Sequence, residues 1–386
     1  MKTCNFCGEN KPLEGFGKRR GVCKKCRSKR ESARLIAKRN ARKDASAHNY
    51  GKDLLPDGFA LTGVSQMVDA QGDVKVQWLK SKADKARQTE ILMQAMREML
   101  EGYDGKAKPA KAPAKPKDES KELLAVIPLG DPHIGLHCWH EETGEDFDLK
   151  IAAANMRTAI AALMAVAPNC AECQIINLGD YFHADNSDDT TSKGTPVDVD
   201  GRRIKVVRVG LDIFIDIIDQ ALLKFPIVRV ICVTGNHDAD SSKMLALMLE
   251  KLYRKEPRVL VDSAPTKHHM YRWGKVMIAT THGDTGKDLD LGMIMATDWK
   301  QDFAKSEFYH WYKGHVHHDS LKEYTGGIIV ETFRTLAPGD SWHRGQGYRS
   351  GQNLKLDVWH SEYGHQNRHI IGIEKIKRLK GKKCRD

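Results

Sequence analysis

The segment Ile227-Val-Arg-Val-Ile-Cys-Val233, followed by Thr234-Gly235-Asn236-His237-Asp238, shows the pattern that decides the fold of this chain. A run rich in β-branched residues predicts a buried strand, and the glycine after it predicts a sharp turn. The amide, imidazole and carboxylate that follow are side chains that bind metals or exchange protons. The segment therefore predicts a strand whose carboxyl end carries functional groups.

The same arrangement recurs along the chain after other strand-like runs, among them Leu124–Leu129, Gln174–Leu178 and Val276–Thr281. A single cluster of this kind is more often a capped turn than a site, but five in order predict a shared centre. Parallel strands end at one edge of a sheet, so these side chains are expected to converge. The clusters, in chain order, are Asp131-Pro132-His133, Gly179-Asp180-Tyr181-Phe182-His183, Gly235-Asn236-His237-Asp238, His282-Gly283-Asp284 and Gly314-His315-Val316-His317.

Helical patterns near residues 149–166 and 205–225 separate these strands. Alternation of short apolar runs with helices predicts an α/β fold whose sheet is buried on both faces.

Residues 123–375 resemble the calcineurin-like metallophosphoesterase superfamily, because all five signature motifs of that superfamily are present. The resemblance implies a four-layer α/β/β/α sandwich with two metal ions that share one bridging carboxylate. Carried over motif by motif, it implies that one metal is held by Asp131, His133, Asp180 and His317, and the other by Asp180, Asn236, His282 and His315.

The resemblance also assigns roles in catalysis. His237 would be the acid that protonates the leaving oxygen, and Asp238 is expected to orient the His237 ring. Two cations would clamp a phosphate and lower the pKa of a bridging water, so that a metal-bridging hydroxide attacks. Mixed His, Asp and Asn ligands admit manganese, iron, nickel or zinc, and manganese is the expected metal.

The second motif bears on the substrate. It continues Gly179-Asp180-Tyr181-Phe182-His183 and lacks the Asp-Arg-Gly continuation of phosphoprotein phosphatases. In break-repair nucleases of the SbcD type, this motif often has a His beside the substrate phosphate at the position of His183. That similarity predicts a nucleic-acid phosphodiesterase, most simply a DNA nuclease, although a histidine hydrogen-bonded within its loop needs no such role.

Three alternatives remain open at this point. The chain is a nuclease, a phosphomonoesterase or cyclic-nucleotide phosphodiesterase acting on small substrates, or a non-catalytic DNA-binding protein. The unit at 54–101, the Pro/Lys linker and the segments Asp185-Asn186-Ser187 and Tyr309-His310-Trp311-Tyr312 also resemble phosphoesterases encoded by tailed bacteriophages, which would place the chain in the host cytoplasm. The related repair nucleases work with an ATPase, which leaves an ATPase partner open as an alternative beside a homodimer, and the sequence shows neither.

The N-terminal segment contains two pairs of cysteines, Cys4-Asn5-Phe6-Cys7 and Cys23-Lys24-Lys25-Cys26. Four thiolates at this spacing predict one structural zinc ion. The chain has nine cysteines and no secretory signal, so metal binding and burial are expected rather than disulfides. Cys170 and Cys173 are expected to be buried, reduced thiols.

Residues 1–50 hold 15 Lys and Arg against 4 Asp and Glu, and Arg27–Lys43 reads as a basic helix. This surplus predicts contact with nucleic-acid phosphates, although a merely solubilising helix is the alternative. The candidate phosphate-binding residues are Lys24, Lys25, Arg27, Lys29, Arg30 and Arg34.

The sequence predicts five segments. A zinc module with its basic helix at 1–45 is followed by a small α+β unit at 46–101, which has a helix from Leu79 to Leu100, and by a Pro/Ala/Lys linker at 102–121. The metallophosphoesterase domain is expected at 122–376 and a basic tail at 377–386. No apolar run approaches the roughly 20 residues that span a bilayer, so no membrane contact and a cytoplasmic location are expected.

Two further groups of residues have weaker expectations. The polar loop 185–203 is a candidate cap over the site, and Arg334, Arg344 and Arg349 are either phosphate contacts or solvated loop residues. The side chains of Trp299, Trp311 and Trp342 are expected in the core.

Overall fold

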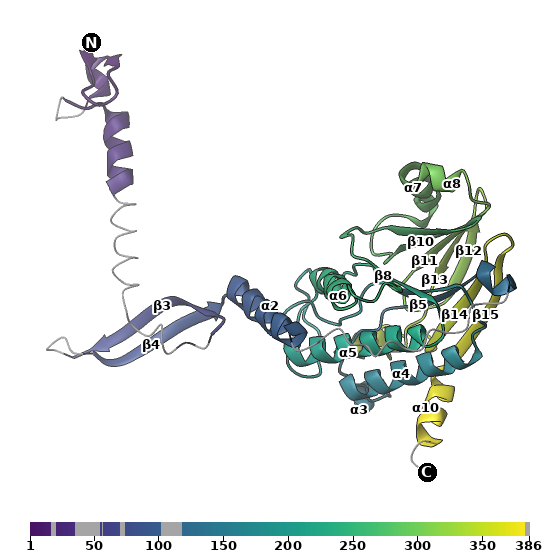
Figure 1. Ribbon diagram of the computed structural model, residues 1–386. Helices are drawn as coiled ribbons and strands as arrows, with labels where there is room; N and C mark the ends of the chain where they lie inside the picture. Colours follow the sequence, from purple (N-terminus) through teal and green to yellow (C-terminus); the bar gives the residue numbers. More distant parts are fainter. Residues whose placement is uncertain (17–20, 35–54, 56, 70–73, 102–117, 383–386) are drawn as a thin grey trace. The chain divides into compact units, whose positions relative to one another are not determined.

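The structure is a computed structural model that describes residues 1–16, 21–34, 55, 57–69, 74–101 and 118–382 (Figure 1). Its contacts divide the chain into two compact units, Met1–Gln94 and Ala95–Asp386. Most of the predicted linker, at 102–117, lies outside the described residues, and Asp118–Glu122 forms a 3-10 helix.

The larger unit contains two sheets. The first has six strands in the order β15-β14-β5-β6-β7-β8, and its strands β5 to β8 are parallel. Their bounds are β5 Leu123–Leu129, β6 Glu172–Asn177, β7 Ile227–Cys232, β8 Val259–Asp262, β14 Asn353–His360 and β15 Gly364–Gly372. The second sheet has five strands in the order β12-β13-β11-β10-β9, with β10, β11 and β13 parallel. Their bounds are β9 His269–Trp273, β10 Val276–Thr281, β11 Phe308–Lys313, β12 Ser320–Tyr324 and β13 Ile328–Thr332.

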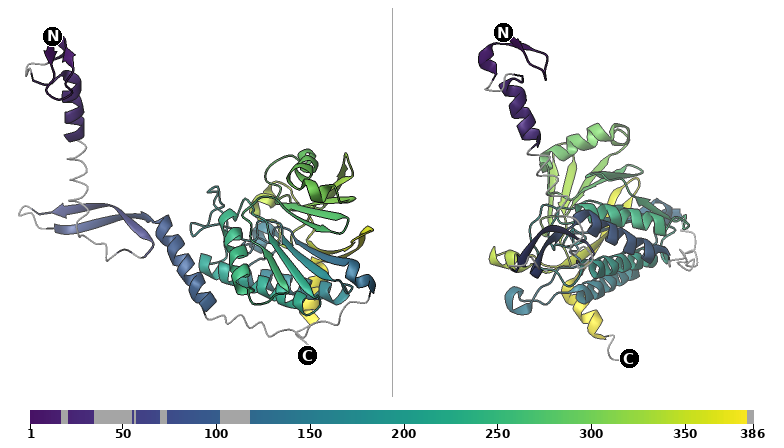
Figure 2. Two further views of the ribbon diagram at one scale, coloured as in Figure 1. Left: turned by 45° about the horizontal axis from the view of Figure 1, so that its top comes forward. Right: turned by 90° about the vertical axis from the view of Figure 1, so that its left-hand side faces the viewer.

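Helices cover the outer faces of both sheets, and Figure 2 shows α7 on the side away from α4 and α5. Helix α4 packs against α5, α10, β14 and β15, while α6 packs against β7 and β8. The bounds are α3 His140–Thr143, α4 Leu149–Val166, α5 Arg203–Leu222, α6 Ala239–Leu252, α7 Leu291–Asp298, α8 Lys300–Phe303, α9 Ser341–Gly345 and α10 Ile373–Lys382, with a 3-10 turn at Asp288–Asp290. The predicted four-layer α/β/β/α sandwich is confirmed.

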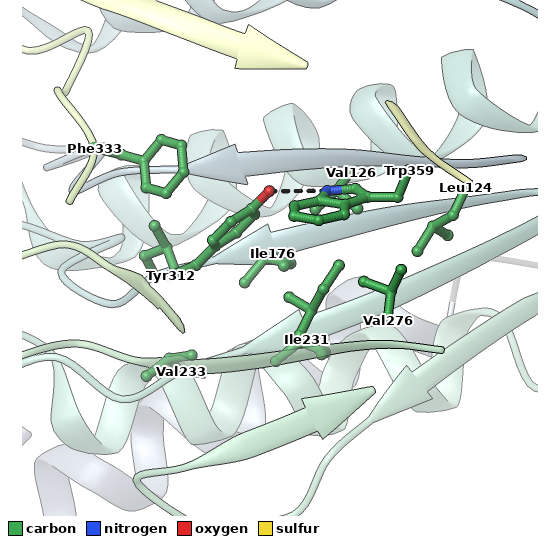
Figure 3. Packing of buried hydrophobic residues seen from close by; sticks show 11 residues of the cluster. Leu124, Val126, Ile176, Ile231, Val233, Val276, Tyr312, Phe333 and Trp359 are labelled. Atoms are coloured by element: carbon green, nitrogen blue, oxygen red, sulfur yellow. Dashed lines mark hydrogen bonds between the residues drawn. The ribbon is translucent and has the colours of Figure 1, made fainter. Parts of the chain in front are cut away.

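Alternation along the strands explains these layers. Leu124 and Val126 of β5 face Val276 and Ile278 of β10 across the space between the sheets (Figure 3). The intervening residues Met277 and Ala279 face the other way and pack with Leu291 and Met295 of α7. Successive side chains on a strand point to opposite faces, so a continuous apolar strand is buried on both sides.

Helix α4 is the one described helix long and apolar enough to cross a membrane by length and composition. Nine of its residues are buried within the larger unit, and Asp148 caps its first turn by accepting from Ile151 N. Its apolar character is therefore accounted for by packing inside the sandwich.

The smaller unit begins with strands β1 Lys2–Thr3 and β2 Asn10–Lys11, a turn at Leu13–Gly15, and a helix over residues 24–34. It continues with a hairpin of β3 Phe59–Val68 and β4 Val74–Ala83, and helix α2 Lys85–Glu101 reaches the boundary between the units. The bidentate pair of Arg87 with Asp57 ties the base of the hairpin to α2.

Several predicted bounds need correction. Strand β4 extends to Ala83, so the helix predicted from Leu79 starts at Lys85. Helix α10 runs through the boundary predicted at 376, because Ile376 is buried and anchors the first part of the predicted basic tail. Of the predicted basic helix, residues 35–43 lie outside the described part of the chain, as do the last residues of the tail, 383–386.

Candidate metal centre and active site

The predicted ligands lie where parallel strands of both sheets end. Asp131, Asp180 and Asn236 follow β5, β6 and β7 of the first sheet, and His282 and His315 follow β10 and β11 of the second. The centre is therefore built between two sheet edges, whereas a shared edge of parallel strands was the sequence-based expectation.

One triad consists of Asp131, His133 and His317, whose ligand atoms all lie within 4.8 Å of one another. The two Nε2 atoms of His133 and His317 lie 3.1 Å apart, and His317 Nε2 lies 3.7 Å from Asp131 Oδ1. Two imidazole nitrogens aimed at one point beside a carboxylate form a donor set that divalent metals prefer.

A second triad consists of Asp180, His282 and His315, again within 4.8 Å. His282 Nε2 lies 3.2 Å from Asp180 Oδ2 and 2.9 Å from Asn236 Oδ1. The other ring nitrogen of His282, Nδ1, is 2.9 Å from the main-chain oxygen of Leu178 and donates to it, which leaves Nε2 for a metal. The structure thus brings all seven predicted ligands into this region, while the role of Asp180 as a bridge between two metals stays a prediction.

The backbone at the ligands has an uncommon conformation. Of the six described non-glycine residues with positive φ, five are predicted ligands. Such conformations cost about 1–3 kcal/mol each and persist where the surroundings enforce them, commonly at functional sites. The five are Asp131, His133, Asp180, His315 and His317, with φ between 44° and 70°.

Glycines make the close packing of these ligands possible. A Cβ at Gly235 would overlap the carboxylate of Asp180, and one at Gly314 would lie 2.6 Å from Asp131 Oδ2. At Gly179, φ is +95° and a Cβ would lie 2.6 Å from His282 Nδ1. The main chain at these three motif glycines lies so close to the ligand side chains that no larger residue would fit.

The charges of the centre fit cations. Asp131 is 0% exposed and Asp180 is 2% exposed, and burying two carboxylates is costly without positive charge. Burial disfavours the charged form of His282, yet Asp180 and Asp131 raise its pKa to about 10. One imidazolium offsets one of the two carboxylates, so divalent metal ions suit this donor set better than protons do.

The imidazoles of the first triad are in the form that binds metals. Burial, together with neighbouring imidazoles, lowers the pKa of His133 well below its usual value and that of His317 to about 3. Burial raises the pKa of Asp131 to about 8, because removal from water disfavours the carboxylate in the absence of a cation. The neutral rings of His133 and His317 can donate electron pairs, and the buried carboxylate of Asp131 needs a positive charge beside it. Both properties fit a metal ion.

His183 occupies a different place from the one expected. It is 2% exposed and is not among the residues that line the cavity beside the centre. Its Nδ1 lies 3.2 Å from Nδ1 of His133, and its ring stacks at 5.3 Å on that of His237. His183 thus contacts the ring of a predicted ligand, and its expected contact with a substrate phosphate stays a prediction.

The contacts of His237 and Asp238 also differ in part from the expectation. His237 Nδ1 lies 2.8 Å from the main-chain oxygen of His183, which orients the ring. The carboxylate of Asp238 instead accepts from the main-chain N–H groups of Asp180, Phe182 and Gly235 and from the Ser242 hydroxyl. The expectation that Asp238 orients the His237 ring is wrong, because its oxygens fix the loops that hold Asp180.

A cavity of about 800 Å³ opens beside the centre and is lined by Asp180, Asn236, His237, His315 and His317. Residues outside the five motifs line it too, namely Lys193, Asp340, Trp342, His343, Arg344, Tyr348 and Arg349. Trp342, expected in the core, is exposed. His343 stacks on His317 with ring centroids 5.1 Å apart, and only the cluster of arginines and glycines signalled this segment in the sequence.

The four N-terminal cysteines form a separate cluster, with all Sγ atoms within 4.8 Å of one another. Main-chain N–H groups of Cys23 and Phe6 donate to Cys4 Sγ, and the Cys23 contact lowers the pKa of Cys4 to about 6. Hydrogen bonding to Cys23 and burial raise the pKa of Cys26 to about 12. A tetrahedral zinc site has sulfurs about 3.8 Å apart, so Cys4, Cys7, Cys23 and Cys26 fit one zinc ion.

The predicted phosphate-binding residues lie on the helix at residues 24–34. Arg27 is half-buried, and the guanidinium of Arg30 lies 5.5 Å from the centre of the Phe6 ring. The side chains exposed to solvent are Lys24, Lys25, Lys29, Arg30 and Arg34.

Cys170 and Cys173 are buried and free, as expected.

No protein-family model matches the sequence, and no curated protein matches it. Among solved structures, the chain is similar to a predicted phosphoesterase from Streptococcus pneumoniae, with 11% identity over 65% of this chain and 98% of that chain and a TM-score of 0.26. It is also similar to a dimetal phosphatase from Danio rerio, with 10% identity, coverage of 64% and 98%, and a TM-score of 0.35. A 5'-nucleotidase precursor from Thermus thermophilus shares 10% identity over 65% of this chain and 54% of that chain, with a TM-score of 0.30. Similarities this distant assign no activity to the chain.

Proposed function

We propose that this chain is a two-metal-ion phosphoesterase that hydrolyses phosphodiester bonds of nucleic acid. The observation that carries the proposal is the pair of His/Asp triads, three of whose members, Asp180, His315 and His317, line a cavity of about 800 Å³. Four of the five motifs that resemble the calcineurin-like metallophosphoesterase superfamily supply every residue of both triads, and the fifth places Asn236 beside His282.

The residues around the cavity have complementary roles. Bound divalent cations, with manganese as the proposed metal, would polarise a phosphoryl oxygen and lower the pKa of a water molecule. His237 lines the cavity, and its Nδ1 proton is held by the oxygen of His183. Its Nε2 is then the nitrogen that gives a proton to the leaving oxygen. Asp238 keeps Asp180 in place through the main chain.

Two features support nucleic acid as the substrate. The cavity is lined by Lys193, Arg344 and Arg349, which suit a phosphate chain rather than a neutral ester. The exposed lysines and arginines at residues 24–34 are proposed to tether the chain to a polyanion, with the zinc ion stabilising that module.

A phosphomonoesterase or cyclic-nucleotide phosphodiesterase is the second candidate. The 2% exposure of His183 weakens one argument for DNA, which was the similarity of that residue to the substrate histidine of repair nucleases. A DNA-binding protein without catalysis is the third candidate. Location in a host cytoplasm, a homodimer and an ATPase partner stay predictions.

The test is hydrolysis by the purified full-length chain with added manganese. The substrates are bis-p-nitrophenyl phosphate, p-nitrophenyl phosphate, a cyclic nucleotide, and single- and double-stranded DNA. We expect cleavage of DNA and of the diester, and loss of both in His237→Ala but not in His369→Ala, whose side chain lies on β15 outside the cavity. Hydrolysis of the monoester or cyclic nucleotide alone would favour the second candidate, and no hydrolysis with intact DNA binding would favour the third.

A further inference from the structure

One wall of the cavity is formed by the segment 338–352, which includes α9. Asp340 caps this helix, since its Oδ1 accepts from His343 N at 2.8 Å and lies 2.7 Å from His343 Nδ1. The His343 ring in turn stacks on the ligand His317, with an interplanar angle of 18°. The wall is therefore fixed with respect to the metal centre.

This wall presents two aromatic rings to solvent. Trp342 is 61% exposed and Tyr348 is 59% exposed, and their ring centroids lie 6.0 Å apart with an interplanar angle of 35°. Trp311, in contrast, is fully buried against α7. The faces of these two rings are in contact with water rather than with other side chains. A flat ligand that stacks on them would bury this apolar surface.

Cationic groups accompany these rings. Arg349 Nη1 donates to the main-chain oxygens of Arg344 and Tyr348, so its guanidinium is held beside the aromatic pair. Lys193 extends from the loop 185–203, which is tied to the start of α6 because Ser192 Oγ accepts from Ala239 N. The acidic residue Glu145 also lines the cavity, but it accepts from Gln352 and pairs with Lys377. The open charge at the aromatic wall is therefore positive.

We propose that Trp342 and Tyr348 are a stacking surface for an unpaired nucleobase, so that the cavity takes a nucleotide unit with its phosphate toward the triads and its base on this pair. The inference rests on the proposed function and narrows its substrate class. Aromatic rings stack on any base and therefore give little sequence preference. In a duplex, each base face is already covered by the neighbouring base pairs. The ligand is therefore a single-stranded segment or a free nucleotide.

The kinetic test compares two esters with the same leaving group, thymidine 5′-p-nitrophenyl phosphate and methyl p-nitrophenyl phosphate. In Trp342→Ala, we expect kcat/KM for the thymidine ester to fall by about tenfold, the loss typical of one stacked base, with the methyl ester unaffected. Trp342→Phe retains a ring and should keep most of the preference. Tyr363→Ala is the matched control for Tyr348→Ala, because Tyr363 is exposed but lies outside the cavity.

Equal losses for both esters, or no loss for either, would overturn the inference while leaving the phosphoesterase proposal in place. If the wild-type chain hydrolyses neither ester, the proposed function fails, and binding then tests the inference alone. Saturation-transfer NMR with thymidine 5′-monophosphate, without added divalent metal, should show the thymine protons in contact with the wild type and released in Trp342→Ala.

A competition experiment separates the two sources of the nucleotide. Displacement of thymidine monophosphate by a short single-stranded oligothymidine at lower concentration would identify a strand, and displacement only at equal or higher concentration would identify a free nucleotide. Both results also require that the oligothymidine, titrated directly, bind Trp342→Ala more weakly than the wild type. Displacement by duplex DNA as readily as by the single strand, or by a phosphopeptide instead, would overturn the proposal.

Discussion

Nδ1 of His183 lies 3.2 Å from Nδ1 of His133, so a buried side chain outside the cavity holds the ring of a proposed metal ligand. The other ring nitrogen of His133, Nε2, lies 3.1 Å from Nε2 of His317. Partners that orient a ligand ring commonly change metal affinity by 10- to 100-fold.

His183→Ala should therefore weaken metal binding by about 10- to 100-fold without unfolding the chain. Manganese titration followed by electron paramagnetic resonance of the free ion measures this, with His369→Ala as the control. An unchanged affinity would show that packing alone holds His133.

Gly235→Ala should abolish metal binding at the second triad, because the new methyl group would overlap the carboxylate of Asp180. Gly381→Ala is the control, since a Cβ there has no heavy-atom neighbour within 4 Å among the described residues. Metal content of the purified variants and their melting temperatures give the answer. Wild-type metal content in Gly235→Ala would mean that Asp180 is not a ligand.

Arg368→Met should destabilise the larger unit by about 3–5 kcal/mol, the usual cost of leaving buried charges without their partner. The guanidinium of Arg368 bonds Asp357 and Glu331, both of which are buried. Urea unfolding measures the loss. Arg272→Met is the control, because its pair with Asp302 is partly exposed and should contribute at most about 1 kcal/mol.

The same cluster predicts how stability depends on pH. Burial would raise the pKa of Asp357, but His365 and Arg368 hold it below its ordinary value, and His310 and Arg368 do the same for Glu331. Carboxyls with a depressed folded-state pKa stabilise the fold above their unfolded values, and that contribution is lost as pH falls. Wild-type stability should therefore fall as the pH drops below about 4, more steeply than in Arg368→Met. Parallel curves would mean that Arg368 does not set these pKa values.

Cys23→Ser should remove the structural zinc and unfold the described residues 1–16 and 21–34, since the buried side chains of that module are mainly its cysteines and Phe16. Zinc content and far-ultraviolet circular dichroism test this, and Cys170→Ser, which lies outside the cluster, should keep one zinc per chain. Retention of zinc by Cys23→Ser would contradict the four-cysteine site.

A double substitution of Lys25→Ala and Lys29→Ala should weaken DNA binding and reduce the dependence of affinity on salt. Each lost phosphate contact lowers the slope of log affinity against log salt by about 0.9. Lys300→Ala with Lys322→Ala is a control for charge alone, because these exposed lysines belong to the larger unit outside the cavity. Equal slopes in both double variants would show no role for residues 24–34.

Much of the centre could be predicted because each ligand follows a strand whose apolar run is plain in the sequence. Asp131 after β5 and His282 after β10 are examples, and α4 has the predicted bounds of Leu149 and Val166. The sequence did not show that β5 and β10 belong to different sheets, because strand periodicity carries no information on which strands pair.

The contacts around the ligands were harder to predict than the ligands. Asp238 was expected to face the ring next to it in sequence, but its carboxylate accepts from the main-chain N–H groups of Asp180 and Gly235. Trp342 was expected in the core, since a large apolar residue is buried by default, but it lies exposed on α9.

Each triad draws its members from both sheets: Asp131 and His133 follow β5 while His317 follows β11, and Asp180 follows β6 while His282 and His315 follow β10 and β11. A metal ion bound at either triad would thus join the two halves of the sandwich at one edge, in addition to the apolar core. Sliding one sheet past the other would pull both donor sets apart together. On heating, the ligand clusters should accordingly come apart in the same cooperative transition in which the two layers separate. Tight metal binding would act as a non-covalent crosslink across the fold.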